Sequence, residues 1–167
     1  MSRPTRTKTD DLTSVRASLQ HYATRGAFRS FSEVSGPPGT AAFRFLWFRD
    51  VSFHVVFSPR TRTLTFVNLL PGVPVRSAMD RHLRAFVKAR TLRSIPEHRR
   101  LDLARVGMKV LNRGGGVSIA FALKPRHVEY GVKKAVHLVH EVLMDFLNEP
   151  QYVEYNIDHF NLNPEMA

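Results

Sequence analysis

The sequence contains no cysteine, so the chain has neither disulfide bonds nor a thiolate that could serve as nucleophile or metal ligand. It also has no apolar run long enough to cross a bilayer. The N-terminal segment MSRPTRTKTDD is polar and basic, without the apolar stretch of a secretory signal. These absences predict a cytoplasmic protein with no membrane partner.

Motifs that bind phosphate or carry catalysis are also missing. The chain has no G-x-G-x-x-G, no Gly-Lys-Ser/Thr ending and no G-x-S-x-G. The nearest metal motif is His137-x-x-His140-Glu141, but helical zinc sites need two histidines four residues apart. We therefore predict a protein that is not an enzyme and has no catalytic residue, metal or cofactor. A hydrolase with a dispersed site is kept as an alternative, because catalytic sets assemble from distant positions.

Positive charge is abundant and unevenly placed. The chain has 25 Lys and Arg against 14 Asp and Glu, which gives a net charge of +11. Residues 76–113 hold eleven of these cations and only Asp80, Glu97 and Asp102 as acids. From Glu149 onward there are four acids and no Lys or Arg. This asymmetry indicates an anionic partner for the body of the protein, or a tail that folds back onto it.

The order of apolar patterns predicts an α+β two-layer sandwich, in which an antiparallel sheet packs against helices. Helical spacing runs from about Asp10 to Gly26, and period-two spacing begins at Ala27. The expected later elements are a strand at 28–34, a meander across 43–70, helices at 75–92 and 94–111, strands at 117–124 and 126–131, and a helix at 131–148. The expected divisions are a disordered basic arm at 1–9, a single domain at 10–148 and an acidic, aromatic tail at 149–167 that docks onto it.

Three consecutive glycines, Gly114 to Gly116, interrupt this order. A strand follows them and the pattern before them predicts a helix, whereas phosphate loops run from a strand through glycines into a helix. We therefore interpret the glycines as a turn that ends a helix.

Aromatic residues in the meander set an expectation about surfaces. If the turn at Arg49-Asp50 is a tight two-residue hairpin, Leu46 and Phe48 join the core face. Phe43, Phe45 and Trp47 then lie on the opposite, wet face, and such an apolar stripe needs a cover. Either the chain itself or a second subunit supplies that cover.

The element order resembles the type III secretion chaperones and the related YbjN-like proteins. The likeness is carried by FRFLWFRDVSFHVVF and TLTFVNLL, the segment VLNRGGGVSIAFAL and the closing helix VKKAVHLVHEVLMDFLN. It implies a homodimer without enzymatic activity that binds other proteins through hydrophobic surface. Secretion chaperones are usually acidic and this chain is basic, so the YbjN-like side fits better.

Two functions follow as expectations. The first is a chaperone-like or adaptor protein that dimerises through Phe43, Phe45 and Trp47 and holds a protein client, which its basic surface would place near nucleic acid. The second is a DNA- or RNA-binding protein without sequence specificity. The cations expected to contact an anionic partner are Arg81, Arg84, Lys88, Arg90, Arg93, Arg99, Arg100, Arg105 and Lys109.

Overall fold

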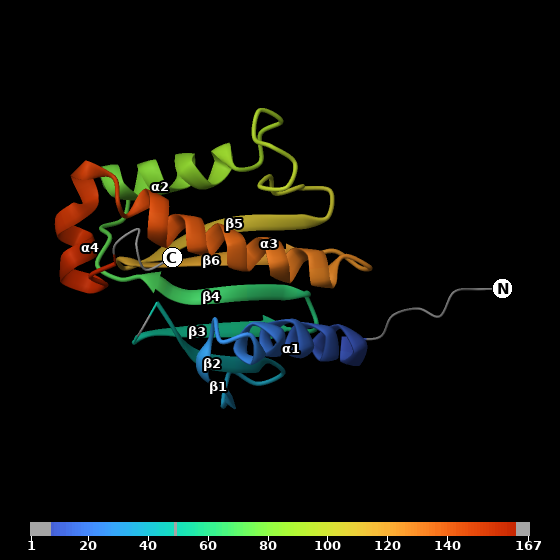
Figure 1. Cartoon of the computed structure of the whole chain (residues 1–167). Helices are drawn as coiled ribbons and strands as arrows, with labels where there is room; N and C mark the ends of the chain where they lie inside the picture. The colour runs from blue at the N-terminus through green and yellow to red at the C-terminus, as the bar shows by residue number, and fades with distance from the viewer. Residues whose placement is uncertain (1–7, 49, 163–167) are drawn as a thin grey trace.

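The computed structural model describes residues 8–48 and 50–162, which fold into a sheet and a layer of helices (Figure 1). The helices are α1 (Lys8–Thr24), α2 (Ala78–Ala89), α3 (Val128–Glu141) and α4 (Val153–His159). The strands are β1 (Arg29–Val34), β2 (Ala41–Trp47), β3 (Val51–Ser58), β4 (Thr63–Leu70), β5 (Val106–Arg113) and β6 (Gly116–Leu123). A π-helical turn (Val142–Phe146) follows α3, and a 3-10 turn (Pro150–Tyr152) precedes α4.

All six strands form one antiparallel sheet in the order β1-β2-β3-β4-β6-β5. The helices α1 and α3 lie across one face, α2 runs along the β5 side, and α4 lies at the end of the sheet (Figure 1). The predicted α+β two-layer sandwich is confirmed. None of the helices in the described part of the chain is long and apolar enough to cross a membrane.

The core lies between the sheet and α1 and α3. Val15 and Leu19 of α1 and Val132 and Val139 of α3 are fully buried against the strands. On α3, Gly131 lets the helix approach β6 closely, because a Cβ there would lie 2.4 Å from the Leu123 side chain. Seven phenylalanines have almost no exposed surface, so the aromatic residues of the chain lie mainly in this one core.

The three-glycine segment is a turn, as predicted, but it joins two strands. Arg113 pairs with Gly116, and Gly114 and Gly115 between them have φ of 59° and 99°. Two central residues with positive φ make the tight hairpin turn that suits the twist of a sheet. The helix predicted at 94–111 is therefore wrong: residues 90–105 form loops and turns, and β5 begins at Val106.

The other element predictions need smaller corrections. The first helix begins at Lys8, inside the expected basic arm, and residues 1–7 lie outside the described residues. The α2 helix covers 78–89 of the expected 75–92, and α3 begins at Val128, so no strand forms at 126–131. The expected closing helix ends in the π-helical turn, whose extra residue per turn accompanies burial of Leu143 and Phe146.

The C-terminal segment docks onto the domain. Val153, Tyr155 and Ile157 alternate in the sequence as strand residues do, but they form α4 with Val153 and Ile157 exposed. Buried Asn156 donates to the Leu162 carbonyl and accepts from the Leu162 amide, both at 2.9 Å. The Tyr155 hydroxyl donates to the Pro71 carbonyl, and burial raises the pKa of this tyrosine. Residues 163–167 of the predicted tail lie outside the described residues.

Candidate functional site

The aromatic stripe predicted as a partner-binding surface is buried inside this one chain. Phe43 and Phe45 have no exposed surface and Trp47 has 8 %. Trp47 pairs with Val51, so the β2–β3 turn contains three residues instead of two. That single-residue change of register turns every β2 side chain to the other face of the sheet. The prediction that these aromatics form an exposed interface is therefore wrong.

The face of the sheet opposite the helices is the main open surface. Its central strands carry only small, hydroxyl and β-branched side chains and one imidazole: Ser52, His54 and Val56 on β3, Thr63, Thr65 and Val67 on β4, and Ser118, Ala120 and Ala122 on β6. We call this the uncovered face. The loop between β1 and β2 folds over part of it, so closely that a Cβ added at Gly36 would lie 2.8 Å from the Cβ of Ala42.

Charge is confined to the borders of the uncovered face. Arg44 lies on β2, and Lys109 and Arg113 lie on the outermost strand β5. The strand residue Glu33 points to the helix side, where it forms an ion pair with Arg16 of α1 at 3.0 Å. The six strands therefore place no carboxylate on the uncovered face. A hollow of about 600 Å³ lies beside Arg113, between Val56, Val67 and Leu111.

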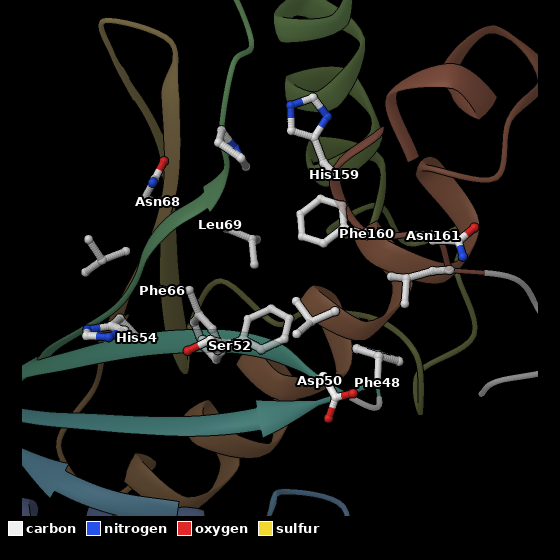
Figure 2. Close-up of a pocket in the computed structure, with 15 residues that line it drawn as sticks. Phe48, Asp50, Ser52, His54, Phe66, Asn68, Leu69, His159, Phe160 and Asn161 are labelled. Atoms are coloured by element: carbon white, nitrogen blue, oxygen red, sulfur yellow. The ribbon is translucent and has the colours of Figure 1, made fainter. Parts of the chain in front are cut away.

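A cleft of about 570 Å³ opens where β3 and β4 separate (Figure 2). Its walls come from the start of β3, the end of β4, the last residue of α4 and the C-terminal segment that follows α4. Phe160 lies between the strands and the C-terminal helix, with His159 and Asn161 on either side of it in sequence (Figure 2). Polar groups reach the same cleft from Asp50, Ser52, His54 and Asn68.

A bulge in β4 produces this cleft. Phe66 pairs with Ile119 but Leu70 pairs with Val117, so β4 contains two extra residues over this stretch. Asn68 adopts φ of 49° and its amide donates to the Ser118 hydroxyl at 2.9 Å. The bulge bends β4 toward β6 and away from β3. Consequently Val51, Ser52 and Phe53 pair with β2 but with no strand of the described chain on their other side.

The histidines of α3 do not converge on a metal site. The ring of His140 packs on Trp47 and Phe48, and Glu141 pairs with Arg90 at 2.7 Å. Burial lowers the pKa of both His137 and His140; nearby Lys133 and Lys134 lower that of His137 further. Within residues 8–48 and 50–162, no group of three or more histidines and carboxylates could hold a metal ion.

The nine cations predicted to contact an anionic partner fall into two groups. Four of them form ion pairs within the chain: Arg84 with Asp80, Arg90 and Arg99 with Glu141, and Arg105 with Asp102. Arg84 also donates to the Val110 carbonyl at 3.0 Å, which joins α2 to β5. The other five have no carboxylate within 4.0 Å among the described residues: Arg81, Lys88, Arg93, Arg100 and Lys109.

The cleft and the uncovered face were not found by reading the sequence. Asn68 and the Pro71-Gly72 pair were the available signals of a bend in β4, since Asn and Gly tolerate positive φ. The uncovered face had no signal of its own, because small residues alternating with core residues are typical of any half-solvated strand.

Comparison with known proteins gives no relative. No protein-family model, no curated protein and no solved structure matches the chain. The resemblance to type III secretion chaperones and YbjN-like proteins therefore remains a likeness in the order of elements.

Proposed function

We propose that the protein is a non-catalytic binding protein of the chaperone or adaptor type, which forms a homodimer through the uncovered face and holds an extended segment of a protein client in the cleft. The observation that carries the proposal is the uncovered face, whose centre has no charged residue while its borders are cationic. Depletion of charge at the centre and a polar rim are typical of protein interfaces.

The size of this face suits a dimer. Six strands about 4.8 Å apart and about seven residues long span a flat area on the order of 600 Å². Its accessible area is larger than this projection, and a standard interface buries about 800 Å² per partner. Two such faces from two copies would pack about 10 Å apart as the sheets of a β-sandwich do.

The edges of the sheet are poor alternatives for association. On β1, Ser30 has φ of 52° and the register shifts between Arg29 and Ser32, so this edge is irregular. On β5, the Arg84 side chain donates a hydrogen bond to the outward-facing carbonyl of Val110. Irregular or side-chain-capped edges resist strand-to-strand pairing. Pairing of copies is therefore expected face to face.

The cleft offers main-chain and side-chain recognition together. The open side of Val51 to Phe53 presents strand backbone to which an extended peptide can add as a further strand. Phe66 and Phe160 give the same cleft apolar walls. A volume of about 570 Å³ falls in the range of known ligand sites and admits a few side chains of a client.

Solution mass tests the dimer. Val67 on the uncovered face is 41 % exposed and Val153 on α4 is 43 % exposed, so they form a matched pair. Light scattering after gel filtration should give a dimer for the wild type and for Val153→Arg. Val67→Arg should give a monomer, because the arginine would be desolvated at the interface without a partner. A wild-type monomer at about 100 μM would refute the dimer.

Site-specific cross-linking tests the cleft. Because the chain has no cysteine, Asp50→Cys creates one attachment point at the cleft, away from the uncovered face, and Gln20→Cys creates one on the exposed side of α1. Each would carry a photo-activated cross-linker, and a permanently unfolded polypeptide would be added. Cross-links from position 50 in at least several-fold excess over position 20 support the proposal. Equal yields would contradict it.

A further inference from the structure

We propose that the α2 side of the molecule binds the phosphate backbone of nucleic acid without reading its sequence. This inference does not depend on the dimer or on the cleft. It rests on where the cations of residues 76–113 lie once the chain is folded, and on which of them already have partners.

Two of the three acids in residues 76–113 already form ion pairs with arginines of the same segment. Asp80 is 4 % exposed, accepts hydrogen bonds from Arg84 and Asn112, and so faces the interior. Asp102 pairs with Arg105 at 3.3 Å. Glu97 is the one acid of the segment for which no ion pair forms within the described residues. The excess of positive charge in the sequence is therefore an excess at the surface.

Five cations on the α2 side have no carboxylate partner in the described part of the chain, and we call them the α2 basic surface. They are Arg76, Arg81, Lys88, Arg93 and Arg100. The first four are exposed, and Arg100 is half-buried. Lys109 and Arg113, also exposed and without ion pairs, extend the positive charge along β5 to the border of the uncovered face.

Two cations of the α2 basic surface lie on one side of α2. Arg81 and Lys88 are seven residues apart, which places them two turns apart on the same side of the helix, about 10 Å from each other. Arg76 precedes the helix and Arg93 follows it, so cations also flank both ends of a helix that measures about 18 Å. Double-stranded DNA carries one negative charge per about 1.7 Å, so a helix of this length spans several phosphates.

The partner is identified by this chemistry. Four of the five cations are arginines, whose planar guanidinium groups pair with phosphate through two hydrogen bonds. The large aromatics of β2 and β3, on which bases could stack, are buried and offer no stacking surface. Backbone contacts without base contacts give affinity without sequence specificity.

An anionic membrane is the competing partner. Leu92 and Leu103 are 50 % and 53 % exposed and flank the same loops, and apolar side chains beside cations are typical of proteins that lie on a membrane surface. Nucleic acid is favoured because the free cations follow the whole of α2, whereas the two leucines lie only near its C-terminal end.

Fluorescence anisotropy with labelled 30-nucleotide single- and double-stranded DNA, over a range of salt, tests the proposal. The variant Arg81→Gln/Lys88→Gln/Arg93→Gln removes three cations from the α2 basic surface. The control Arg25→Gln/Arg60→Gln/Lys133→Gln removes three exposed cations elsewhere and the same net charge. All six side chains are exposed, so circular dichroism should show both variants folded.

We expect wild-type affinity to fall steeply with salt, and the first variant to lower that slope by roughly 2 to 3, since each phosphate contact contributes about 0.9. The control should leave the slope within about 1 of the wild type. Equal loss in both variants would overturn the assignment to α2, and so would absence of binding at low salt. Binding to vesicles rich in phosphatidylserine but not to DNA, abolished by Leu92→Ser/Leu103→Ser, would overturn it in favour of a membrane.

Discussion

The two faces of the sheet are built from the same strands but have opposite chemistry. Adjacent residues show the difference: Phe45 has no exposed surface and stacks on Phe28 in the core, whereas Leu46 is half-buried on the other side. The helix-covered face concentrates nearly all of the large aromatic residues, and the uncovered face has none of them on its strands. The first face holds the domain together, and the second is left for other molecules.

The comparison also explains why the fold is complete without a partner. Burial of about ten aromatic rings and the aliphatic residues of α3 supplies the hydrophobic driving force from one layer alone. The uncovered face needs no second layer because its side chains are short and cover little apolar area. A partner added there would then contribute affinity to binding and little to folding.

The largest expected effect contrasts Phe45→Ala with Leu46→Ala. Phe45 stacks on Phe28 at a ring distance of 4.0 Å inside the core, so its loss should lower the free energy of unfolding by about 3–5 kcal/mol. Leu46→Ala should lower it by less than about 1.5 kcal/mol, because Leu46 is only partly buried. Urea denaturation measures both. The reverse order would mean that β2 has the register predicted from a two-residue turn.

A smaller difference in stability is expected between substitutions of two neighbouring valines of β3. Val55→Thr places a hydroxyl in the core without a partner and should cost about 1–3 kcal/mol. Val56→Thr puts the same group on the uncovered face, among Thr65 and other half-solvated residues, and should change stability by less than about 0.5 kcal/mol. Thermal melts of the two variants, both made in the Val67→Arg protein in which the proposed dimer is broken, provide the measurement. Equal costs there would show that the chain itself seals the uncovered face.

Asp80 is a buried carboxylate of α2, and replacing it tests whether its charge stabilises the fold. Burial acts to raise the pKa of this carboxyl, but the hydrogen bonds from Asn112 and Arg84 outweigh it, so the pKa lies below its ordinary value. A depressed folded-state pKa stabilises the protein above the unfolded pKa, about 3.9, and that contribution is lost as pH falls through the folded value.

Asp80→Asn should therefore cost about 1–2 kcal/mol at pH 7, and the difference from wild type should shrink below about pH 4. Urea denaturation from pH 3 to 7 measures it. The control Asp158→Asn, on the exposed side of α4, should change stability by less than about 0.5 kcal/mol throughout. A difference that stays constant down to pH 3 would show that the Asp80 charge is not what stabilises the α2–β5 contact.

The smallest expected effect concerns the turn that fixes the register of β5 and β6. Gly115 has φ of 99° and Gly114 has φ of 59°. Gly115→Ala should destabilise by about 1 kcal/mol, because alanine is strained at that φ. Gly114→Asn should be within about 0.5 kcal/mol of wild type, since asparagine tolerates the left-handed region and suits this turn. Equal losses in both variants would argue against the two-residue turn.

Some of these features follow from local pattern alone. The helix pattern of Val15 and Leu19, the alternation through β3 and the breaks at Pro59 and Pro71 were sufficient for most elements and for the two-layer class. The segment 94–111 was misread because Val106 and Val110 satisfy helical spacing while Val106, Met108 and Val110 also alternate. Pairing with β6 decided between the two periods, and pairing is a long-range contact.

By itself, the sequence determined the two-layer fold class, the absence of thiol chemistry and the charge excess of residues 76–113. These features depend only on residue identity and near neighbours. Only the tertiary structure decided which face each strand residue occupies and which cations are already paired. One residue more in the β2–β3 turn inverts a whole strand, and no local property of Phe43, Phe45 or Trp47 records the length of that turn. Likewise, Glu141 lies far from Arg90 in sequence, and only folding brings the two charges together.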